Sequence, residues 1–311
     1  MHAELCADPM GGACAKSSLP SQSGSSSSEP SQLPSAGLEA DLAFLHRCAR
    51  ADLSAASREA SAQSYSSSRG RSAVLVATGT FCPPHMGHLY MLQAAARSLS
   101  HAVEVVGAIM VPSSDQYVKD KAQWRGDRTR QPSYELRAEL IQAMAVELDL
   151  GFQIHISDAE AERGLFYLEV GAHLAKVADC IARGPVSATP ILIFVTGGDR
   201  WNPLLQRFEG GDGVVVIPRA GDEMNSRIPA RSEWPRWARD NPCRVVAEPL
   251  AGTVSTLSST RLRSVIDAAL KENSNEAPHV RQDAAISAAS DFMTPSAASI
   301  YVQWLFRGAG E

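Results

Sequence analysis

The segment AVLVATGTFCPPHMGH, residues 73–88, decides the fold of this chain. It opens with a continuous apolar run that ends at Gly79, which is typical of a short strand buried on both faces of a parallel sheet. His85 and His88 follow where the next helix begins, and their spacing puts both imidazoles on one side of its first turn. Helix N-termini attract phosphate through free N–H groups and the helix dipole. The segment therefore predicts a polyphosphate site behind a buried strand.

Outward from this segment, apolar patterns of strand and helix alternate. Strand-like runs cover residues 103–111, 152–156, 190–195, 214–217 and 244–247. Helical periodicity covers residues 89–99, 136–148, 166–181, the stretch from 258, and the C-terminal end. This alternation predicts an α/β fold with a doubly wound parallel sheet. Because such sheets bind ligands at the carboxyl ends of their strands, the chemistry is expected at the loops that follow them.

Two of these loops carry groups suited to a nucleotide. The loop at residues 113–121 contains Lys119 and Lys121, which are long enough to reach an anion. After the strand at 190–195, Gly197 lets the backbone approach a sugar or base, and Asp199 is able to accept hydrogen bonds from ribose hydroxyls. A solvated loop and a plain turn are the ordinary alternatives at these two places.

A third candidate is the segment LSSTRLR, residues 257–263. Ser258 or Ser259 is a good helix N-cap. The helix behind it would present backbone N–H groups, hydroxyls and a guanidinium to a phosphate. A capped helix with a surface arginine is the ordinary alternative. All these motifs stand at predicted strand ends or helix starts, and this agreement favours a nucleotide site.

The N-terminal part differs in composition from the rest. Residues 1–70 are predicted to be a largely disordered, serine-rich extension, because there is too little apolar surface to offset the entropy of ordering. A short amphipathic helix is expected near residues 38–53, where Leu38, Leu42, Leu45 and Ala49 share one face. Docking on the main body and a regulatory or targeting role are its two interpretations. Residues 71–311 are predicted to be the catalytic domain.

Bulk properties exclude several classes of function. The net charge of −5 gives no overall basic field for nucleic acid. No apolar run is long enough for a membrane span, and no secretory signal is visible, so the cytoplasm or the nucleus is expected. The 6 cysteines contain no zinc-like spacing, which indicates free thiols in a reducing compartment.

The segment GTFCPPHMGH at 79–88, followed much later by SSTRLR at 258–263, resembles the HxGH nucleotidyltransferase superfamily, with its Rossmann-like fold. Within it, the chain looks most like the eukaryotic nicotinamide mononucleotide adenylyltransferases. The likeness runs from about residue 73 to the C-terminus. It includes VGAIMVPSSDQYVK at 106–119, Tyr134 with Arg137, GGD at 197–199, VIPRAG at 216–221 and MTPS at 293–296.

The resemblance implies transfer of the adenylyl group of ATP to nicotinamide or nicotinic acid mononucleotide, giving the dinucleotide and pyrophosphate. It implies Mg²⁺ as cofactor, no metal ligand from the protein, and a homo-oligomer. The residues implied in catalysis are His88, His85 and Arg263. Those implied at ATP are Gly79, Thr80, His88, Gly197, Asp199, Ser259, Thr260, Arg261, Leu262 and Arg263. Those implied at the mononucleotide are Phe81, Tyr117, Lys119, Trp201 and Glu248.

The chain departs from the family pattern at two positions. Cys82 stands where the family usually has Asn or Asp, and Ala159 stands where many members have an aromatic residue that stacks on the pyridine ring. A cytidylyltransferase or a pantetheine-phosphate adenylyltransferase shares both end motifs and stays an alternative, as does a non-catalytic nucleotide-binding chaperone or sensor. The segment at 222–241, rich in Arg and Trp, has two interpretations, a lid over the substrate and a surface loop.

Overall fold

A computed structural model describes residues 36–60, 72–161, 190–198, 213–218, 236–250 and 252–307, together with 169–170, 174, 228 and 230–234. The residues between these ranges, the first 35 residues and the last four lie outside the described residues. The disorder that the sequence predicts for the N-terminus therefore stays a prediction. So does most of the helix expected at 166–181.

Six parallel strands form the sheet, in the order β3-β2-β1-β4-β5-β6. Their bounds are β1 Ser72–Gly79, β2 Glu104–Pro112, β3 Gln153–Ile156, β4 Ile191–Gly197, β5 Gly213–Ile217 and β6 Arg244–Val246. The chain builds outward from β1 to β3 and then returns to the other side of β1 at β4. This order puts the topological switch point between β1 and β4, where doubly wound sheets bind their ligands. The predicted α/β fold is confirmed.

Alternate residues of the central strands enter different cores. Val74 and Val76 of β1 belong to one hydrophobic cluster, whereas Ala73, Leu75 and Ala77 belong to the cluster on the other face. All five side chains are essentially inaccessible to solvent. A continuous apolar run is what a strand covered on both faces requires. The run at 73–78 therefore forms the centre of the sheet.

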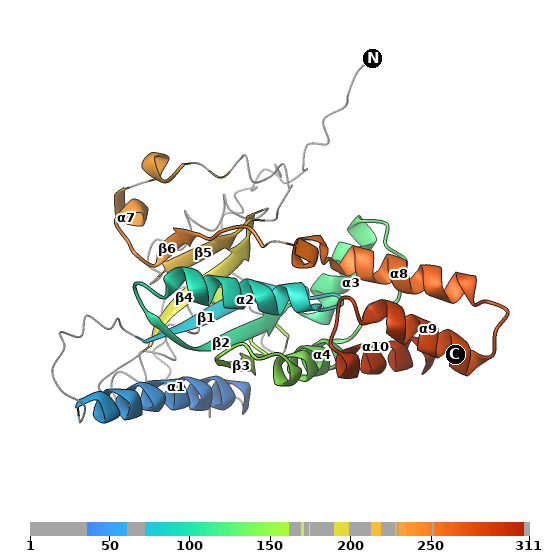
Figure 1. The fold of residues 1–311 in the computed structure, drawn as a ribbon, viewed down its shortest axis with the longest axis horizontal. Coiled ribbons are helices and arrows are strands. Elements are labelled where there is room, and N and C mark those ends of the chain that lie inside the picture. Colours follow the sequence, from blue (N-terminus) through green and yellow to red (C-terminus); the bar gives the residue numbers. More distant parts are fainter. Residues whose placement is uncertain are drawn as a thin grey trace, which may run out of the picture. The chain divides into compact units, whose positions relative to one another are not determined.

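One face of the sheet is covered by α2 (Met86–Leu99) and α4 (Tyr134–Glu147). Ser133 caps α4, since its Oγ accepts a hydrogen bond from the N–H of Leu136. Three C-terminal helices, α8 (Ser259–Glu272), α9 (Pro278–Ala289) and α10 (Pro295–Arg307), form a group next to α4, with α10 in contact with it (Figure 1). They share a third hydrophobic cluster with Leu89 of α2 and Leu140 of α4.

The other face of the sheet packs against α1, which covers Ala36–Ala60 and so extends beyond the predicted range at both ends. Phe44, Leu45, Cys48 and Ala49 are buried there, in contact with β1 and β2. The approach is close, because a Cβ added to Gly107 would lie 2.8 Å from the Phe44 ring. The predicted helix thus docks on the sheet.

A buried polar contact also holds α1. Asp41 is fully buried, and one carboxylate oxygen lies 2.9 Å from Nε2 of His155, at β3. Its other oxygen accepts a hydrogen bond of 3.1 Å from the hydroxyl of Ser157. The ring of Phe44 stacks on His155 with 5.0 Å between centroids. The position of α1 is therefore tied to the end of β3.

The segment after β2 is helical, whereas its sequence predicts a loop. The helix α3 covers Asp115–Trp124, and the Ser114 side chain caps it by accepting a hydrogen bond from the N–H of Tyr117. Short helical turns complete the described part of the chain. They are η3 (Arg231–Glu233), α7 (Arg236–Arg239) and η4 (Gly252–Thr256). None of the described helices is long and apolar enough to cross a membrane.

Candidate nucleotide site

The carboxyl ends of four strands lie at one edge of the sheet. In the strand register, Gly79 lies opposite Pro112, and Gly197 lies opposite Ile217. The N–H of Ser113 donates to the carbonyl of Gly79 over 2.9 Å, which ties the loops after β1 and β2 together. The segments that the sequence singled out after these strands are therefore neighbours in space.

The loop after β1 is tightly folded around Phe81. This residue has a φ of 42°, a left-handed conformation that is uncommon outside glycine and tends to occur at functional sites. Its ring is buried and meets the ring of His88 edge to face, with 4.9 Å between centroids. A Cβ on Gly79 would lie only 3.2 Å from this ring. Gly79 therefore makes room for Phe81, which in turn supports His88.

The two motif histidines lie together at the N-terminus of α2. His85 is the N-cap and is buried, and its ring lies 3.8 Å from that of His88, centroid to centroid. The backbone N–H of His85 donates to Nδ1 of His88 over 3.1 Å. An imidazole nitrogen that accepts a hydrogen bond carries no proton, so the neutral ring of His88 has its proton on Nε2. Nε2 of His88 is thus set to act as a hydrogen-bond donor.

Gly87 lies between the first motif and the last one. A Cβ at this position would lie 2.9 Å from Nδ1 of His85 and 3.2 Å from Cβ of Leu257. Leu257 directly precedes the cap of α8, so the absence of a side chain lets the N-termini of α2 and α8 approach each other. A small cavity of about 30 Å³ adjoins this contact and is lined by His85, Gly87, His88, Met91, Ile217, Pro218, Leu250, Val254 and Leu257.

The N-terminus of α8 binds two backbone carbonyls of the histidine loop, the name used here for residues 80–85 between β1 and α2. The hydroxyl of Ser259 donates to the carbonyl of Pro83 over 2.7 Å. Nη1 of Arg263 donates to the carbonyl of Cys82 over 2.6 Å. Of the two predicted cap residues, Ser258 caps the helix by accepting a hydrogen bond from the N–H of Arg261. The two motifs that carry the family resemblance are therefore in direct contact.

Arg137 of α4 fixes the base of the same loop. Its guanidinium donates to the carbonyls of Thr80 and Ser113, over 2.8 and 2.6 Å, and pairs with the carboxylate of Asp115 at 2.8 Å. The side chain is completely buried. A buried guanidinium needs partners for its charge, and here the partners of Nη1 and Nη2 join the ends of β1 and β2 to the start of α3.

A second cavity, of about 50 Å³, lies between α3, α8 and the histidine loop. Its walls are formed by Thr80, Cys82, Val118, Lys121, Ala122, Arg125, Asp127, Gln131 and Arg263. Three of these residues are cations, and Nζ of Lys121 lies 3.4 Å from the hydroxyl of Thr80. The local concentration of positive charge suits a phosphate, even though the whole chain is acidic.

Cys82 borders this cavity as a neutral thiol. Burial raises the pKa of Cys82 to about 11, more than the nearby Arg137 and Arg263 lower it. Its Sγ donates to Oε1 of Gln131 over 2.9 Å. The thiol therefore holds the loop between α3 and α4 against the histidine loop, and at neutral pH it is a weak nucleophile.

Several other predicted residues take different positions. Lys119 is exposed and is not part of the cavity wall, whereas Lys121 is. Tyr117 meets the ring of Trp124 edge to face, with 6.3 Å between centroids. Glu248 is exposed, just beyond the end of β6.

On α8, Thr260 and Arg261 are exposed at the first turn. The Leu262 side chain is fully buried in the core, and its N–H donates within the helix to the carbonyl of Ser258. The side chain and the N–H of Leu262 are therefore both engaged within the protein. A nucleotide at this turn would contact the residues next to Leu262.

Asp199 and Trp201 lie outside the described residues, whereas Gly197 ends β4 and Gly198 follows it. In the segment at 222–241, the described part contains η3, α7 and Trp234, whose ring is buried in the cluster on the α1 face. Ala159, at the position where the family often has a stacking aromatic, is buried in the same cluster.

The predicted site residues do not include four polar or charged residues that line the cavity of about 50 Å³, named here the cationic cavity: Lys121, Arg125, Asp127 and Gln131. The sequence predicts that both Lys119 and Lys121 are long enough to reach an anion. The helical spacing of α3 would have placed these two side chains on different faces. Asp127 and Gln131 belong to the connection between α3 and α4, which carries no sequence pattern that points to the site.

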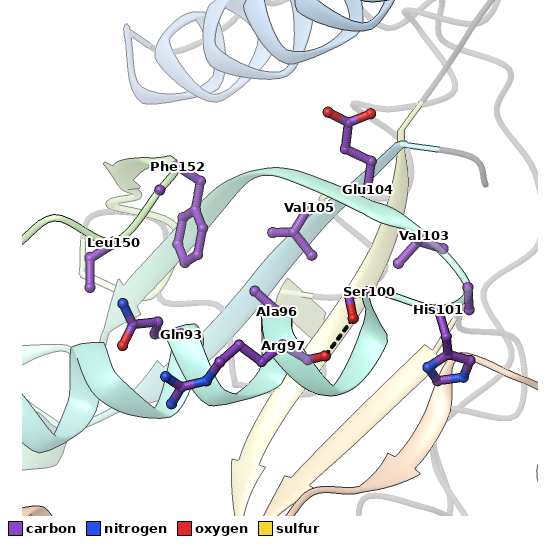
Figure 2. Close-up of a pocket in the computed structure, with 12 residues that line it drawn as sticks. Gln93, Ala96, Arg97, Ser100, His101, Val103, Glu104, Val105, Leu150 and Phe152 are labelled. Carbon is purple, nitrogen blue, oxygen red and sulfur yellow. Dashed lines mark hydrogen bonds between the residues drawn. The ribbon is translucent and has the colours of Figure 1, made fainter. Parts of the chain in front are cut away.

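A larger cavity lies at the other edge of the sheet. It has a volume of about 620 Å³ and lies between the C-terminal half of α2 and the beginnings of β2 and β3. Figure 2 shows Val105 and Phe152 on the wall that faces α2, while the carboxylate of Glu104 points away. None of the predicted site residues that the structure describes lines it. Because doubly wound sheets bind ligands at the carboxyl ends of their strands, the smaller cavities form the candidate site.

No model of a known protein family matches the chain, and no curated protein matches it significantly. Among solved structures, the chain is similar to a Plasmodium falciparum nicotinic acid mononucleotide adenylyltransferase complexed with NaAD. The identity is 11%, the TM-score is 0.46, and the match covers 75% of this chain and 96% of that chain. A likeness this distant does not transfer an activity, so the function of this chain has to be argued from its own site.

Proposed function

We propose that this chain is a nucleotidyltransferase that transfers the adenylyl group of ATP to nicotinamide or nicotinic acid mononucleotide. One observation carries the proposal: the histidine loop and the start of α8, 181 residues apart in sequence, are joined by the hydrogen bond from Arg263 to the Cys82 carbonyl. Two helix N-termini and two histidines thus meet at the carboxyl edge of a parallel sheet. A group of cations lines a second cavity on the same loop. Helix N-termini, histidine donors and cations are the groups with which proteins bind a polyphosphate.

In the proposed reaction, an oxygen of the mononucleotide phosphate attacks the α-phosphorus of ATP. The new P–O bond forms as the bond from the α-phosphorus to the bridging oxygen breaks, and pyrophosphate leaves with the electron pair. The attacking phosphate is already an anion at neutral pH, so no general base is needed. Catalysis then depends on positioning and on neutralising charge on the phosphoryl oxygens.

The residues of the chain have distinct parts in this proposal. Nε2–H of His88 donates to a phosphoryl oxygen, since the backbone N–H of His85 fixes its tautomer. Lys121 and Arg263 neutralise charge on the phosphates from the walls of the cationic cavity. Arg137 and Ser259 hold the loop carbonyls, so that the histidines keep their place.

The donor set fits Mg²⁺ only as a companion of the triphosphate. No group of three or more potential ligands is found among the residues that the structure describes. The two carboxylates nearest the histidine loop, Asp115 and Asp127, already pair with Arg137 and Arg263. Mg²⁺ usually binds through substrate phosphates and one or two carboxylates. When bound, it would neutralise charge on the phosphates.

The test is a direct assay of the purified full-length chain. It is mixed with ATP, Mg²⁺ and either nicotinamide or nicotinic acid mononucleotide, and the dinucleotide is separated by chromatography. We expect product from at least one mononucleotide, and the ratio of the two rates gives the preference. A folded protein that binds ATP but forms neither dinucleotide would refute this substrate assignment. Parallel reactions with CTP and with pantetheine phosphate then identify a related transferase, and their failure too favours a non-catalytic nucleotide-binding protein.

A further inference from the structure

Arg263 is engaged by a carboxylate at the place where the proposed function needs a phosphate. Its Nη2 lies 3.0 Å from Oδ2 of Asp127, and both side chains are about four-fifths buried, with exposed fractions of 19% and 20%. The same guanidinium donates through Nη1 to the Cys82 carbonyl. The ion pair is thus sheltered from solvent, where the attraction between the charges is stronger than at an exposed surface.

Asp127 is held in this position by its own loop. Its Oδ1 accepts hydrogen bonds from the N–H and the hydroxyl of Thr129, over 3.0 and 2.6 Å. Gln131 in turn donates to Thr129 and accepts from the Cys82 thiol. Burial alone would raise the pKa of Asp127, but the hydrogen bonds from Thr129 and the charge of Arg263 outweigh it and lower the pKa. The carboxylate is therefore an oriented anion at neutral pH.

The surroundings of Asp127 are cationic. Among the described residues, nine line the cavity of about 50 Å³, and Asp127 is the single acidic one of these nine, with Lys121, Arg125 and Arg263 as the cations. A carboxylate and a phosphate bind a guanidinium with the same oxygen geometry. A phosphate that binds Arg263 in this cavity must displace the carboxylate or share the guanidinium with it.

We propose that Asp127 is an intramolecular competitor for the polyphosphate, occupying Arg263 and thereby setting the affinity of the site for ATP and pyrophosphate. This inference rests on the proposed function, because it assumes that Arg263 binds phosphate. Asp127 adds negative charge where the substrate is negative, so it weakens polyphosphate binding and favours release of pyrophosphate. It also keeps Arg263 against the histidine loop.

The test is the binding of inorganic pyrophosphate, measured by calorimetry on the full chain without Mg²⁺, for the wild type and for Asp127→Asn. The Asn side chain keeps the Oδ1 that accepts from Thr129, and its NH2 group in place of Oδ2 removes the charge and the acceptor that pairs with Arg263. The control is Asp267→Asn, which removes an exposed carboxylate on α8, one helical turn beyond Arg263. A third variant, Asp127→Asn combined with Arg263→Gln, shows whether the effect of Asp127 passes through Arg263.

We expect Asp127→Asn to lower the Kd for pyrophosphate about fivefold, the size of effect associated with one partly sheltered ion pair. Asp267→Asn should change this Kd less than about twofold, and Asp127→Asn should have no effect in the Arg263→Gln background. An unchanged Kd in Asp127→Asn, when the wild type binds pyrophosphate, overturns the competition and leaves the proposed function standing. Weaker binding of this variant to Mg²⁺-pyrophosphate marks Asp127 as a metal ligand and also overturns it. Failure of wild type and variants alike to bind either pyrophosphate or ATP refutes the proposed function as well.

Discussion

The imidazole of His88 takes its tautomer from the backbone beside it. Nδ1 accepts a hydrogen bond from the N–H of His85, so Nε2 carries the proton of the neutral ring. Nε2–H is therefore the donor of this side chain. Phe81, strained at a φ of 42°, supports the ring from the side. At the scale of single residues, His88 is thus a hydrogen-bond donor whose orientation is set by rigid neighbours. Stabilisation of a transition state requires a donor oriented in this way.

Replacing His88 by Ala is expected to lower kcat by about two orders of magnitude or more, the usual cost of losing one transition-state donor. The measurement is initial-rate kinetics of dinucleotide formation, with thermal unfolding to confirm the fold. The matched control is His101→Ala, because His101 is exposed and lines the large cavity at the opposite edge of the sheet. A near-normal kcat in His88→Ala would contradict the role given to this residue.

Lys121 and Lys119 offer a comparison between two lysines of one helix. Lys121 lines the cationic cavity, while Lys119 is exposed on another face of α3. We expect Lys121→Ala to raise the KM of at least one substrate about tenfold, consistent with the loss of one charge-assisted contact. Lys119→Ala should have the smaller effect. The opposite order would show that Lys119 meets the mononucleotide, as the family resemblance implies.

At the scale of elements, α1 is the predicted helix that the structure shows docked on the main body. It covers one face of the sheet, and Phe44, Leu45, Cys48 and Ala49 are buried against β1 and β2. Asp41 adds a buried carboxylate with two partners from the end of β3. A helix held by both apolar and polar contacts is part of the folded body.

Replacing Asp41 by Ala is expected to lower the free energy of unfolding by about 1–3 kcal/mol, because it leaves the Ser157 hydroxyl and the His155 ring without their buried acceptor. Urea denaturation gives this value. The control is Glu39→Ala, which removes a carboxylate from the exposed side of the same helix and should change stability little. Equal midpoints for the two variants would show that the Asp41 contacts contribute nothing.

At the scale of the whole molecule, residues 35–311 form one compact unit that includes α1. The predicted boundary near residue 70 falls between α1 and β1, in a stretch outside the described residues. The nucleotide site depends on this unit as a whole, since loops after β1 and β2, the start of α4 and the start of α8 all contribute contacts. Loss of any of these elements would remove a support of the histidine loop.

A truncation series tests this organisation. Removal of residues 1–34 is expected to leave the melting temperature and the activity near those of the full chain, because the compact unit begins at residue 35. Removal of residues 1–60 also deletes α1 and exposes the apolar residues beneath it, so the protein should aggregate or melt at a much lower temperature. Both are measured by thermal unfolding and the dinucleotide assay. Equal stability of the two truncations would contradict the structural role of α1.

The sequence by itself determined the α/β class, the strands of the sheet, the cap of α8 and the position of the histidine motif. These features follow from local patterns, since a buried strand needs a continuous apolar run and a helix start needs a capping group. It did not indicate α3, because the apolar content of Asp115–Trp124 is low and its main signal is the cap at Ser114. For α1 it offered two interpretations, docking on the main body and a regulatory or targeting role, and the structure shows the docking.

The tertiary structure alone decided which groups meet. Three contacts join elements far apart in the chain. Arg263 pairs with Asp127 and also donates to the Cys82 carbonyl, and Arg137 is buried beneath the ends of two strands. Such partners depend on the relative placement of helices and strands, and that placement follows from packing of the whole core. Local periodicity contains no information about it. Hence the sequence located the chemistry at the strand ends, and only the folded chain showed that an aspartate already holds the arginine expected to bind phosphate.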